Sequence, residues 1–431
     1  MSITIINITG ICVTHFCKKV SSNISTMARL PSPKEFPFVK GLMPQEEMLE
    51  VRKQTQKLVI GIPKESNETE SRMPLTPEAV ELLVEQGHEI IIEEDAGKLT
   101  NYSNTDYSEK GAQIVKTKQE VFKCEIILTV SPLLKEEIDM LSDNQVVFSS
   151  LHLTPNGGQL IKNLMQKRTT AIAFEGIRDT DGAYPLVRAM SSIAGSTSIL
   201  VAAEYLSNVN KGKGVMLGGV SGITPTEVVI LGAGTAGEFA ARAALGLGAN
   251  VKLFDDSIKR LMEVQDILGQ RLYTSIFHKQ VLERVLKTAD VVIGTVQPEE
   301  NKGKFMITED QVKLMKKGSV IVDLSIDRGG CFETSEVRDH KDPAYVKHGV
   351  VHYCVPNITA RVARTSSIAI SNVFTPLLIE IADSGGIKQH LKDDDGLRNG
   401  IYIYNGILTN SYLGSLYNIP SRDINLLMAA F

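Results

Sequence analysis

The residues best suited to chemistry lie in the segment 227–256, which reads EVVILGAGTAGEFAARAALGLGANVKLFDD. Gly232, Gly234 and Gly237 follow the apolar run Val228–Leu231 in the pattern G-x-G-x-x-G. In a dinucleotide site, the first glycine allows a sharp turn and the second lets the backbone approach a pyrophosphate. The third lets a helix pack close to the strand. The pattern predicts such a site, and the alternative is a tight turn without a ligand.

The residues after the glycines complete this prediction. Ala240–Leu247 has a helical composition and Val251–Phe254 is a second apolar run, with Asp255 at its end. A helix N-terminus offers free N–H groups and the positive end of its dipole to phosphates. An acid about 20 residues after the glycines accepts a hydrogen bond from the ribose 2′-OH. Because Asp255 would repel a 2′-phosphate, we expect NAD rather than NADP.

Composition limits the classes of function. A chain of 431 residues with 43% hydrophobic content is long enough for two or three domains. A net charge of −4 gives no reason to expect nucleic-acid binding. The five cysteines are odd in number and form no C-x-x-C pair, which argues against a disulfide framework and a metal site. We expect no membrane span, since the helix after the glycines carries Glu238 and Arg242.

The first residues differ from the rest of the chain. Residues 1–34 contain no Asp or Glu and are rich in Ser and Thr. Such a segment can be an organelle transit peptide, which would indicate a mitochondrial protein. The alternatives, which we favour, are an unstructured tail or an upstream start with Met27 as the true first residue. We therefore expect a cytoplasmic protein in which residues 1–56 form a peripheral leader or extension.

Alternating apolar and helical segments then predict a doubly wound α/β domain. Thr76 and Pro77 are typical of a helix N-terminus. Strands separated by helices indicate a parallel sheet, and this half lacks a glycine fingerprint, so we expect a substrate domain. The expected strands are Leu58–Ile62, His88–Glu93, Ile126–Val130, Val146–Leu151 and Thr170–Phe174.

The second half contains the nucleotide domain between two long helices. Met190–Leu206 and Thr365–Ile381 are expected to be helices that connect the domains. We assign residues 57–189 and 365–431 to the substrate domain and residues 190–364 to the NAD-binding domain. Within the latter we expect a helix at Lys259–Leu268 and strands at Val291–Ile293, Val320–Leu324 and Val350–Tyr353.

Several motifs together resemble one family, the alanine dehydrogenases and the related NAD-binding part of nicotinamide nucleotide transhydrogenases. The motifs are GIPKE with ESRMPLTPEAV, SSLHL, MSSIAG, the glycine loop, VVIGTV, KKGSVIVDLSIDRGGCFET and VPNITARVARTSS. The resemblance runs from about Val59 to near the C-terminus and is closest to alanine dehydrogenase. It implies an α/β fold of two Rossmann-like doubly wound domains joined by long helices. The active site would lie in the inter-domain cleft, and the protein would be a homo-oligomer, commonly a hexamer.

The resemblance also implies roles for three residues on the substrate side. Arg72 matches the arginine that holds the substrate carboxylate, for which a bidentate guanidinium is suited. His152 matches the acid/base histidine and follows an apolar strand, where α/β sheets place ligand sites. Asp327 matches the active-site aspartate, although it could instead be a turn residue before two glycines.

Five residues match positions that contact the cofactor in the family: Ser191, Asp255, Arg260, Val296 and Asn357. Three of them could equally have no part in a site. Ser191 and Arg260 could be exposed helix residues, and Asn357 could be an ordinary loop amide. Asp255 has independent support because it follows the glycine loop at the distance that a ribose contact requires.

One segment departs from the family pattern. Family dehydrogenases carry a lysine in a segment like VKEP, where the cation binds the substrate carbonyl, but this chain reads ILTVSP. Val130 or Ser131 occupies the lysine position, depending on the alignment, and neither is a cation. Lys123 and Lys135 flank the segment but would need a different backbone path. The substrate half is therefore partly rewritten.

The sequence favours an NAD-dependent amino-acid dehydrogenase that oxidises a small amino acid, most simply L-alanine, reversibly to its 2-keto acid and ammonia. The missing lysine leaves open a different amino or keto acid as substrate. A second hypothesis is a transhydrogenase-type NAD(H)-binding subunit that works with a membrane partner. A third is a non-catalytic NAD-responsive binding protein.

Overall fold

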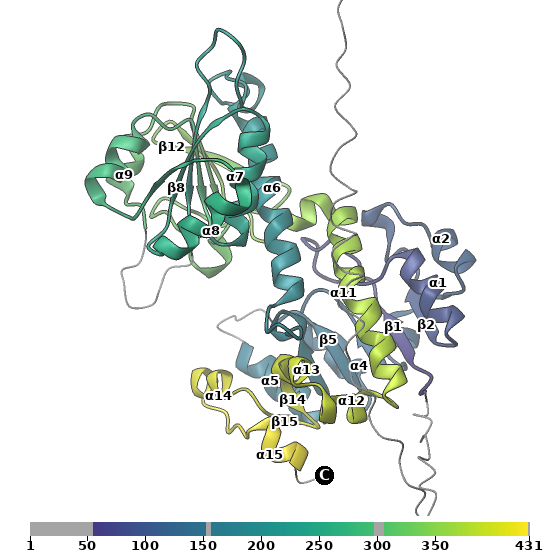
Figure 1. The fold of residues 1–431 in the computed structure, drawn as a ribbon. Coiled ribbons are helices and arrows are strands. Elements are labelled where there is room, and N and C mark those ends of the chain that lie inside the picture. Colours follow the sequence, from purple (N-terminus) through teal and green to yellow (C-terminus); the bar gives the residue numbers. More distant parts are fainter. Residues whose placement is uncertain (1–54, 152–156, 297–305, 430–431) are drawn as a thin grey trace, which may run out of the picture. The chain divides into compact units, whose positions relative to one another are not determined.

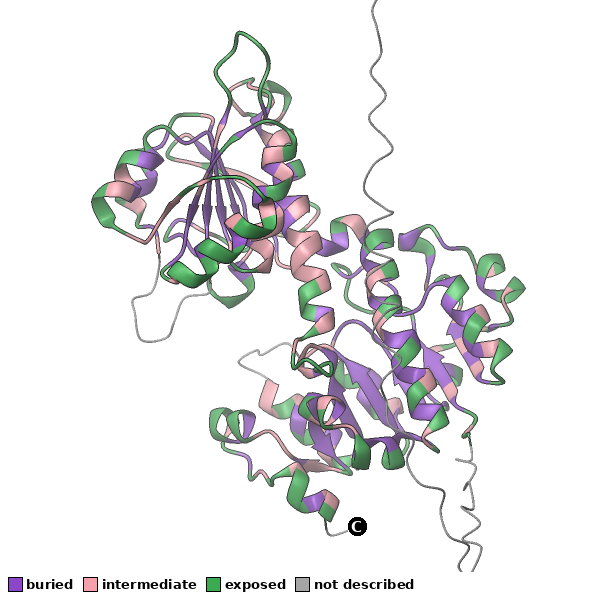
Figure 2. Ribbon diagram, viewed as in Figure 1, coloured by how far each residue is buried: buried purple, intermediate pink, exposed green. Residues whose placement is uncertain are grey.

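The computed structural model describes residues 55–151, 157–296 and 306–429. Two β-sheets organise these residues, and each has its own hydrophobic core (Figure 1). The buried residues concentrate on the strands and on the helix faces that cover them (Figure 2). The chain is therefore built from two α/β arrangements.

The first sheet has eight strands in the order β15-β14-β6-β5-β4-β1-β2-β3. Six of them are parallel and follow the order 3-2-1-4-5-6 of a doubly wound fold, while β14 and β15 are antiparallel. The winding direction reverses between β1 and β4. The strands are β1 Val59–Ile62, β2 Glu89–Glu93, β3 Gln113–Val115, β4 Ile126–Leu128, β5 Val146–Ser149, β6 Thr170–Ala173, β14 Ile401–Tyr404 and β15 Ile407–Leu408.

Helices between these strands follow the local sequence signals. The first helix begins where Thr76 accepts a hydrogen bond from the amide of Ala79, with Pro77 at the first position, as predicted. The helices are α1 Pro77–Glu85, α2 Asn104–Glu109, α3 Lys118–Val121, α4 Lys135–Met140, α5 Gly157–Gln166, α12 Ile387–Asp393, α13 Asp395–Gly400, α14 Ser411–Tyr417 and α15 Ile424–Ala429.

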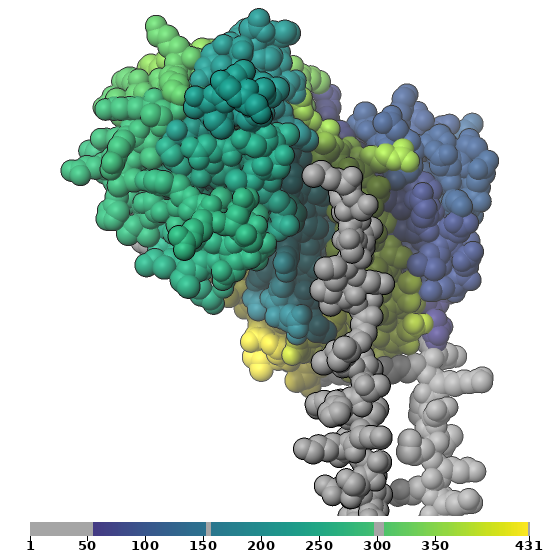
Figure 3. All heavy atoms as spheres, turned by 45° about the horizontal axis from the view of Figure 1, so that its top comes forward, coloured from purple at the N-terminus to yellow at the C-terminus, as the bar shows by residue number. Residues whose placement is uncertain are grey.

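The second sheet has seven strands in the order β12-β13-β11-β10-β7-β8-β9. Its parallel strands repeat the doubly wound order, with the reversal between β7 and β10, and β12 adds an antiparallel edge. The atoms of this region, teal to green in Figure 3, form a closely packed surface in that view. The elements are β7 Glu227–Leu231, α7 Thr235–Gly246, β8 Asn250–Phe254, α8 Ile258–Leu268, β9 Tyr273–Ser275, α9 Lys279–Leu286, β10 Val291–Gly294, α10 Glu309–Val312, β11 Val320–Asp323, β12 Ala344–Lys347 and β13 Val350–Tyr353.

Two long helices connect the segments of the two sheets. They are α6, Pro185–Leu206, and α11, Ala363–Asp383, and the latter follows the 3-10 turn η5, Ile358–Val362. By length and composition alone, residues 185–206 and 358–383 could cross a membrane, which the sequence did not lead us to expect. Both helices place residues in the hydrophobic cores, as core helices do, so this is weak support for membrane insertion.

The structure corrects several sequence predictions. The first sheet is mixed and not wholly parallel, because the chain returns at its C-terminal end to add β14 and β15. The helix after the glycine loop begins at Thr235 and not at Ala240, and α6 begins at Pro185 and not at Met190. Strand β4 ends at Leu128, so the residues that follow it form a loop. The proposed domain boundaries remain predictions.

Close packing between α6 and α7 yields a first test. A Cβ added at Gly195 of α6 would lie 2.1 Å from the carbonyl oxygen of Ala236 in α7, and a backbone atom cannot move aside cheaply. We expect Gly195→Ala to lower the free energy of unfolding by about 1–3 kcal/mol, as overpacking does. Urea unfolding followed by circular dichroism measures it.

Gly246→Ala is the matched control, since a Cβ there would meet nothing within 4 Å. It should leave stability unchanged or raise it by about 0.4–1 kcal/mol. Equal unfolding midpoints for Gly195→Ala and Gly246→Ala would contradict the close packing of α6 on α7.

Candidate active site

Two glycines in the loop between β7 and α7 are required by the fold, because a larger side chain at either position would collide with neighbouring atoms. Gly232 has a φ of 110°, and a Cβ there would lie 2.4 Å from Oγ1 of Thr295. A Cβ at Gly237 would lie 1.8 Å from the carbonyl oxygen of Gly232. A Cβ at Gly234 would meet nothing within 4 Å. Gly234 is the N-cap residue of α7, where glycine is favoured, and the open space beside it also agrees with the predicted pyrophosphate contact.

Asp255 ties the end of β8 to this loop. Its Oδ2 accepts a hydrogen bond of 2.8 Å from the amide of Ala233, and its Oδ1 accepts one of 2.8 Å from the amide of Ser257. Nη1 of Arg260 lies 3.9 Å from the same Oδ2, and the Arg260 side chain is 61% exposed. Asp255 thus stabilises the glycine loop as well as standing at the predicted ribose position.

The end of β10 lies beside the same loop. Oγ1 of Thr295 donates to the carbonyl of Leu231 at 2.8 Å. The side chain of Val296 comes within 3.1 Å of a Cβ built on Gly232, and its carbonyl oxygen accepts from Sγ of Cys331 at 2.9 Å. Strands β7 and β10 flank the reversal of the second sheet, which is where doubly wound folds bind ligands. The structure therefore brings Val296 to the glycine loop, as expected of a shared site.

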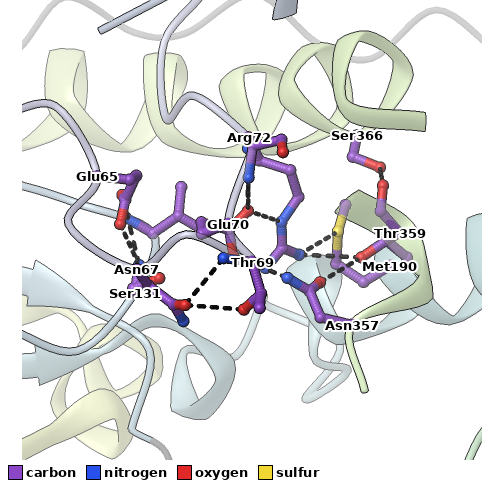
Figure 4. A network of polar contacts seen from close by, with 12 residues as sticks. Glu65, Asn67, Thr69, Glu70, Arg72, Ser131, Met190, Asn357, Thr359 and Ser366 are labelled. Atoms are coloured by element: carbon purple, nitrogen blue, oxygen red, sulfur yellow. Dashed lines mark hydrogen bonds and ion pairs between the residues drawn. The ribbon is translucent and has the colours of Figure 1, made fainter. Parts of the chain in front are cut away.

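On the substrate side, Arg72 is held by Glu70 (Figure 4). Nε of Arg72 donates to Oε1 of Glu70 at 2.7 Å and Nη2 donates to Oε2 at 2.6 Å, which makes the pair bidentate. The Glu70 side chain is 2% exposed and that of Arg72 is 11% exposed. Burial alone would raise the pKa of Glu70, but its hydrogen bonds with Arg72 and the charge of Arg72 hold the pKa below its usual value.

The remaining side of Arg72 faces residues from distant parts of the chain. Nη1 donates to Oγ1 of Thr359 at 3.1 Å and approaches Sδ of Met190 at 3.5 Å. Asn357, in the left-handed conformation before η5, donates from Nδ2 to Oε2 of Glu70 at 2.9 Å. Thr359 and Asn357 also bond each other at 3.0 Å. Asn357, predicted as a cofactor contact, is therefore part of the arginine network, and the half-buried Ser191 follows Met190 in α6.

Asp327 is exposed on the short turn η4, Ile326–Arg328, which follows β11. The buried Asp323 shapes this turn: its Oδ1 accepts from the amide of Ser325 at 3.0 Å and its Oδ2 from the amide of Cys331 at 2.8 Å. Among the described residues, no hydrogen bond or ion pair joins Asp327 to Arg72. His152 lies outside the described residues.

Sequence reasoning missed Glu65 and Glu70. Glu65, half-buried in the loop after β1, accepts on Oε1 from Oγ1 of Thr129 at 2.9 Å and from the amide of Val130 at 2.7 Å. The amide of Ser131 donates to its Oε2 at 3.2 Å. Burial, and next the charge of Glu70, raise the pKa of Glu65 to about 7. An acid in the short loop that follows a predicted buried strand was the signal that could have identified Glu65.

The described residues suit a dinucleotide and give no sign of a metal. The glycine loop, the N-terminus of α7 and Asp255 supply the parts of an NAD site, and the space at Gly234 fits a close phosphate. Among those residues, no group of three or more His, Cys, Asp or Glu side chains could hold a metal ion.

Comparisons with known proteins agree with this geometry. Residues 61–194 match the family model described as the alanine dehydrogenase/PNT N-terminal domain, and residues 198–411 match its C-terminal domain. The chain is 40% identical over 368 residues to an alanine dehydrogenase of Staphylococcus saprophyticus, which covers 85% of this chain and 99% of that protein. It is 38% identical over 366 residues to alanine dehydrogenase 2 of Staphylococcus aureus, with 85% and 98% covered.

Solved structures show the same fold. An L-alanine dehydrogenase structure superposes with a TM-score of 0.79 at 35% identity and covers 84% of this chain and 99% of that chain. A transhydrogenase from Sinorhizobium meliloti superposes with a TM-score of 0.70 at 21% identity over 82% of this chain and 99% of that chain, which indicates a shared fold only. With both family domains matched and the glycine loop and Arg72 network in place, this chain belongs to the alanine dehydrogenase/PNT family.

Proposed function

We propose that this protein is an NAD-dependent alanine dehydrogenase, which converts L-alanine, NAD⁺ and water reversibly to pyruvate, ammonia and NADH. The observation that carries the proposal is the 40% identity to an alanine dehydrogenase along nearly the whole length of that relative. A homo-oligomer in the cytoplasm is part of the same proposal.

Arg72 would hold the substrate carboxylate. Its Nε and Nη2 face Glu70, while the partners of its Nη1 among the described residues are a hydroxyl and a thioether. A thioether is a weak acceptor, so an incoming carboxylate can replace that contact and form a charge-assisted hydrogen bond. Glu70 and Asn357 fix the guanidinium in place, which reduces the entropy lost when substrate binds.

The remaining steps involve proton transfer and water. Bound NAD supplies the hydride acceptor. Oxidation at the substrate Cα yields an imine, and addition of water to it releases pyruvate and ammonia. His152 would exchange the proton and Asp327 would orient the water or ammonia. Asp323 supports Asp327 by accepting hydrogen bonds from backbone amides on both sides of η4.

Oxidation of a different amino acid is the retained alternative, because the segment after β4 offers Val130 and Ser131 where the family pattern has a lysine. A transhydrogenase-type subunit is less well supported, since the likeness to the solved transhydrogenase extends to the fold alone.

The first test of this function is a substrate panel. Purified protein with NAD⁺ and a series of L-amino acids should produce NADH absorbance at least tenfold faster with alanine than with any other amino acid. His152→Ala should abolish that activity while NADH binding is retained. Faster turnover of another amino acid would identify that amino acid as the substrate. No turnover of any amino acid, with NADH binding intact, would contradict the dehydrogenase proposal.

Arg72→Lys tests carboxylate binding. Lysine keeps the positive charge but not the planar guanidinium that forms two parallel hydrogen bonds with a carboxylate. A hydrogen bond to a charged group contributes about 1.5–3 kcal/mol. We expect the KM for alanine to rise at least tenfold, measured by initial rates, with NADH affinity unchanged. Arg284→Lys, an exposed helix arginine on α9, is the control and should behave as wild type. An unchanged KM in Arg72→Lys would remove Arg72 from the substrate site.

Asp255→Ala tests cofactor choice. Removing the acid removes both a ribose acceptor and the repulsion of a 2′-phosphate, so the preference for NAD over NADP should narrow at least tenfold in kcat/KM. Asp256→Ala, its exposed neighbour, should keep the wild-type preference. If both variants discriminate as wild type does, the cofactor does not contact Asp255.

A further inference from the structure

The first sheet has a carboxyl group, that of Glu65, at its own reversal point. Glu65 follows β1 and the segment Thr129–Ser131 follows β4, and these two strands flank the place where the winding reverses. In doubly wound sheets, ligands bind outside the carboxyl ends of the strands at this place. The two loops meet through the hydrogen bonds of the Glu65 carboxyl.

The carboxyl of Glu65 is anchored unevenly. Oε1 receives the hydroxyl of Thr129 and the amide of Val130, at 2.9 and 2.7 Å, whereas within the described part of the chain Oε2 receives a single longer bond of 3.2 Å, from the amide of Ser131. Oε2 is therefore the oxygen that can carry a proton and donate it to a neighbour. A carboxyl in this state is a donor when protonated and an acceptor when ionised.

The surrounding charges control which state prevails. Glu70 lies close enough for its charge to act on Glu65, and Arg72 is already paired with Glu70. Lys118 bonds the carbonyl of Lys64 and the hydroxyl of Ser66 on either side of Glu65, but it is paired with Glu137 at 2.7 Å and lies 4.0 Å from Glu93. The segment that follows β4 contributes no charged side chain between Thr129 and Ser131.

We propose that Glu65 is the residue that recognises the amino or keto group of the substrate, through a change in its own protonation. Ionised Glu65 accepts from the ammonium of an amino acid whose carboxylate is on Arg72. Protonated Glu65 donates to the carbonyl oxygen of the corresponding 2-keto acid. This inference rests on the proposed function. It assigns to Glu65 the contact with the substrate carbonyl that a lysine makes in the family pattern and that this chain lacks.

Charge balance supports this assignment. A 2-keto acid brings one negative charge into a site that holds Glu70, Arg72 and Glu65. With Glu65 ionised the four charges sum to −2, whereas with Glu65 protonated they sum to −1. Binding of a keto acid should therefore take up a proton at Glu65. An amino acid brings its own ammonium and needs no such proton.

The test measures pyruvate binding to the protein–NADH complex without ammonium, by NADH fluorescence, between pH 6 and 8.5. Pyruvate itself does not titrate in this range. Because the pKa of Glu65 is about 7, the Kd for pyruvate should rise about tenfold per pH unit above that pH. The KM for L-alanine should fall as the pH rises through the same range.

Glu65→Gln keeps an oxygen that can accept from the Thr129 hydroxyl and the Val130 amide, loses the second oxygen that accepts from the Ser131 amide, and cannot ionise. In this variant the logarithmic slope of the pyruvate Kd against pH should fall by about one unit. Glu68→Gln is the matched control, since Glu68 is exposed on the same loop and pairs with Lys341, and it should keep the wild-type slope. A wild-type slope in Glu65→Gln overturns the proposal.

Thr129→Val provides a second variant of nearly unchanged shape. The Thr129 hydroxyl lowers the pKa of Glu65, so its removal should move the midpoint of the pyruvate titration to higher pH. An unmoved midpoint also contradicts the proposal. The two proposals fail in different ways. If the wild-type protein does not turn over alanine, the dehydrogenase function and this inference are both wrong. If it does, but Glu65→Gln keeps the wild-type slope of the pyruvate Kd against pH, this inference alone is wrong.

Discussion

The order of the parallel strands is the constraint on which the rest of the structure depends. Each sheet winds in one direction, returns to its first strand and winds in the other, and doubly wound folds bind ligands at the strand ends beside that reversal. In the second sheet the two loops are the glycine loop and the segment at Thr295. In the first sheet they carry Glu65 and Thr129. The same topology thus provides a nucleotide site in one half and a carboxyl group near Arg72 in the other.

The substrate side is governed by the cost of burying charge. Glu70 and Arg72 are both largely buried, and removing one partner of such a pair commonly costs about 3–5 kcal/mol because the other charge remains unpaired. Their bidentate geometry, with Asn357 and Thr359 as further partners, offsets the cost of burying the two charges and fixes the guanidinium in place. Burial and the charge of Glu70 raise the pKa of Glu65 to about 7, and among the described residues no cation hydrogen-bonds its carboxyl to offset them, as Arg72 does for Glu70.

Much of the fold followed from the sequence. Runs of Val, Ile and Leu located most of the parallel strands to within a few residues, although β3 and β9 were missed, and Thr76 with Pro77 located the start of α1. Errors arose where local signals are weak. Small residues at Thr235 and Ala236 gave no apolar periodicity, so α7 was predicted to begin too late, and the short strands β14 and β15 were not recognised. The pairing of β14 with β6 joins residues far apart in the sequence, which no local pattern reveals.

The sequence by itself determined the glycine loop, the position of Asp255 and the family motifs, because these depend on residue types at fixed short spacing. Only the tertiary structure decided how Arg72 is held. Glu70 lies two residues away, but Asn357 and Thr359 are almost three hundred residues distant, and their contacts depend on the packing of η5 and α11. The raised pKa of Glu65 likewise arises from burial and from a neighbouring charge, and both are properties of the folded chain, so residue spacing could not predict them.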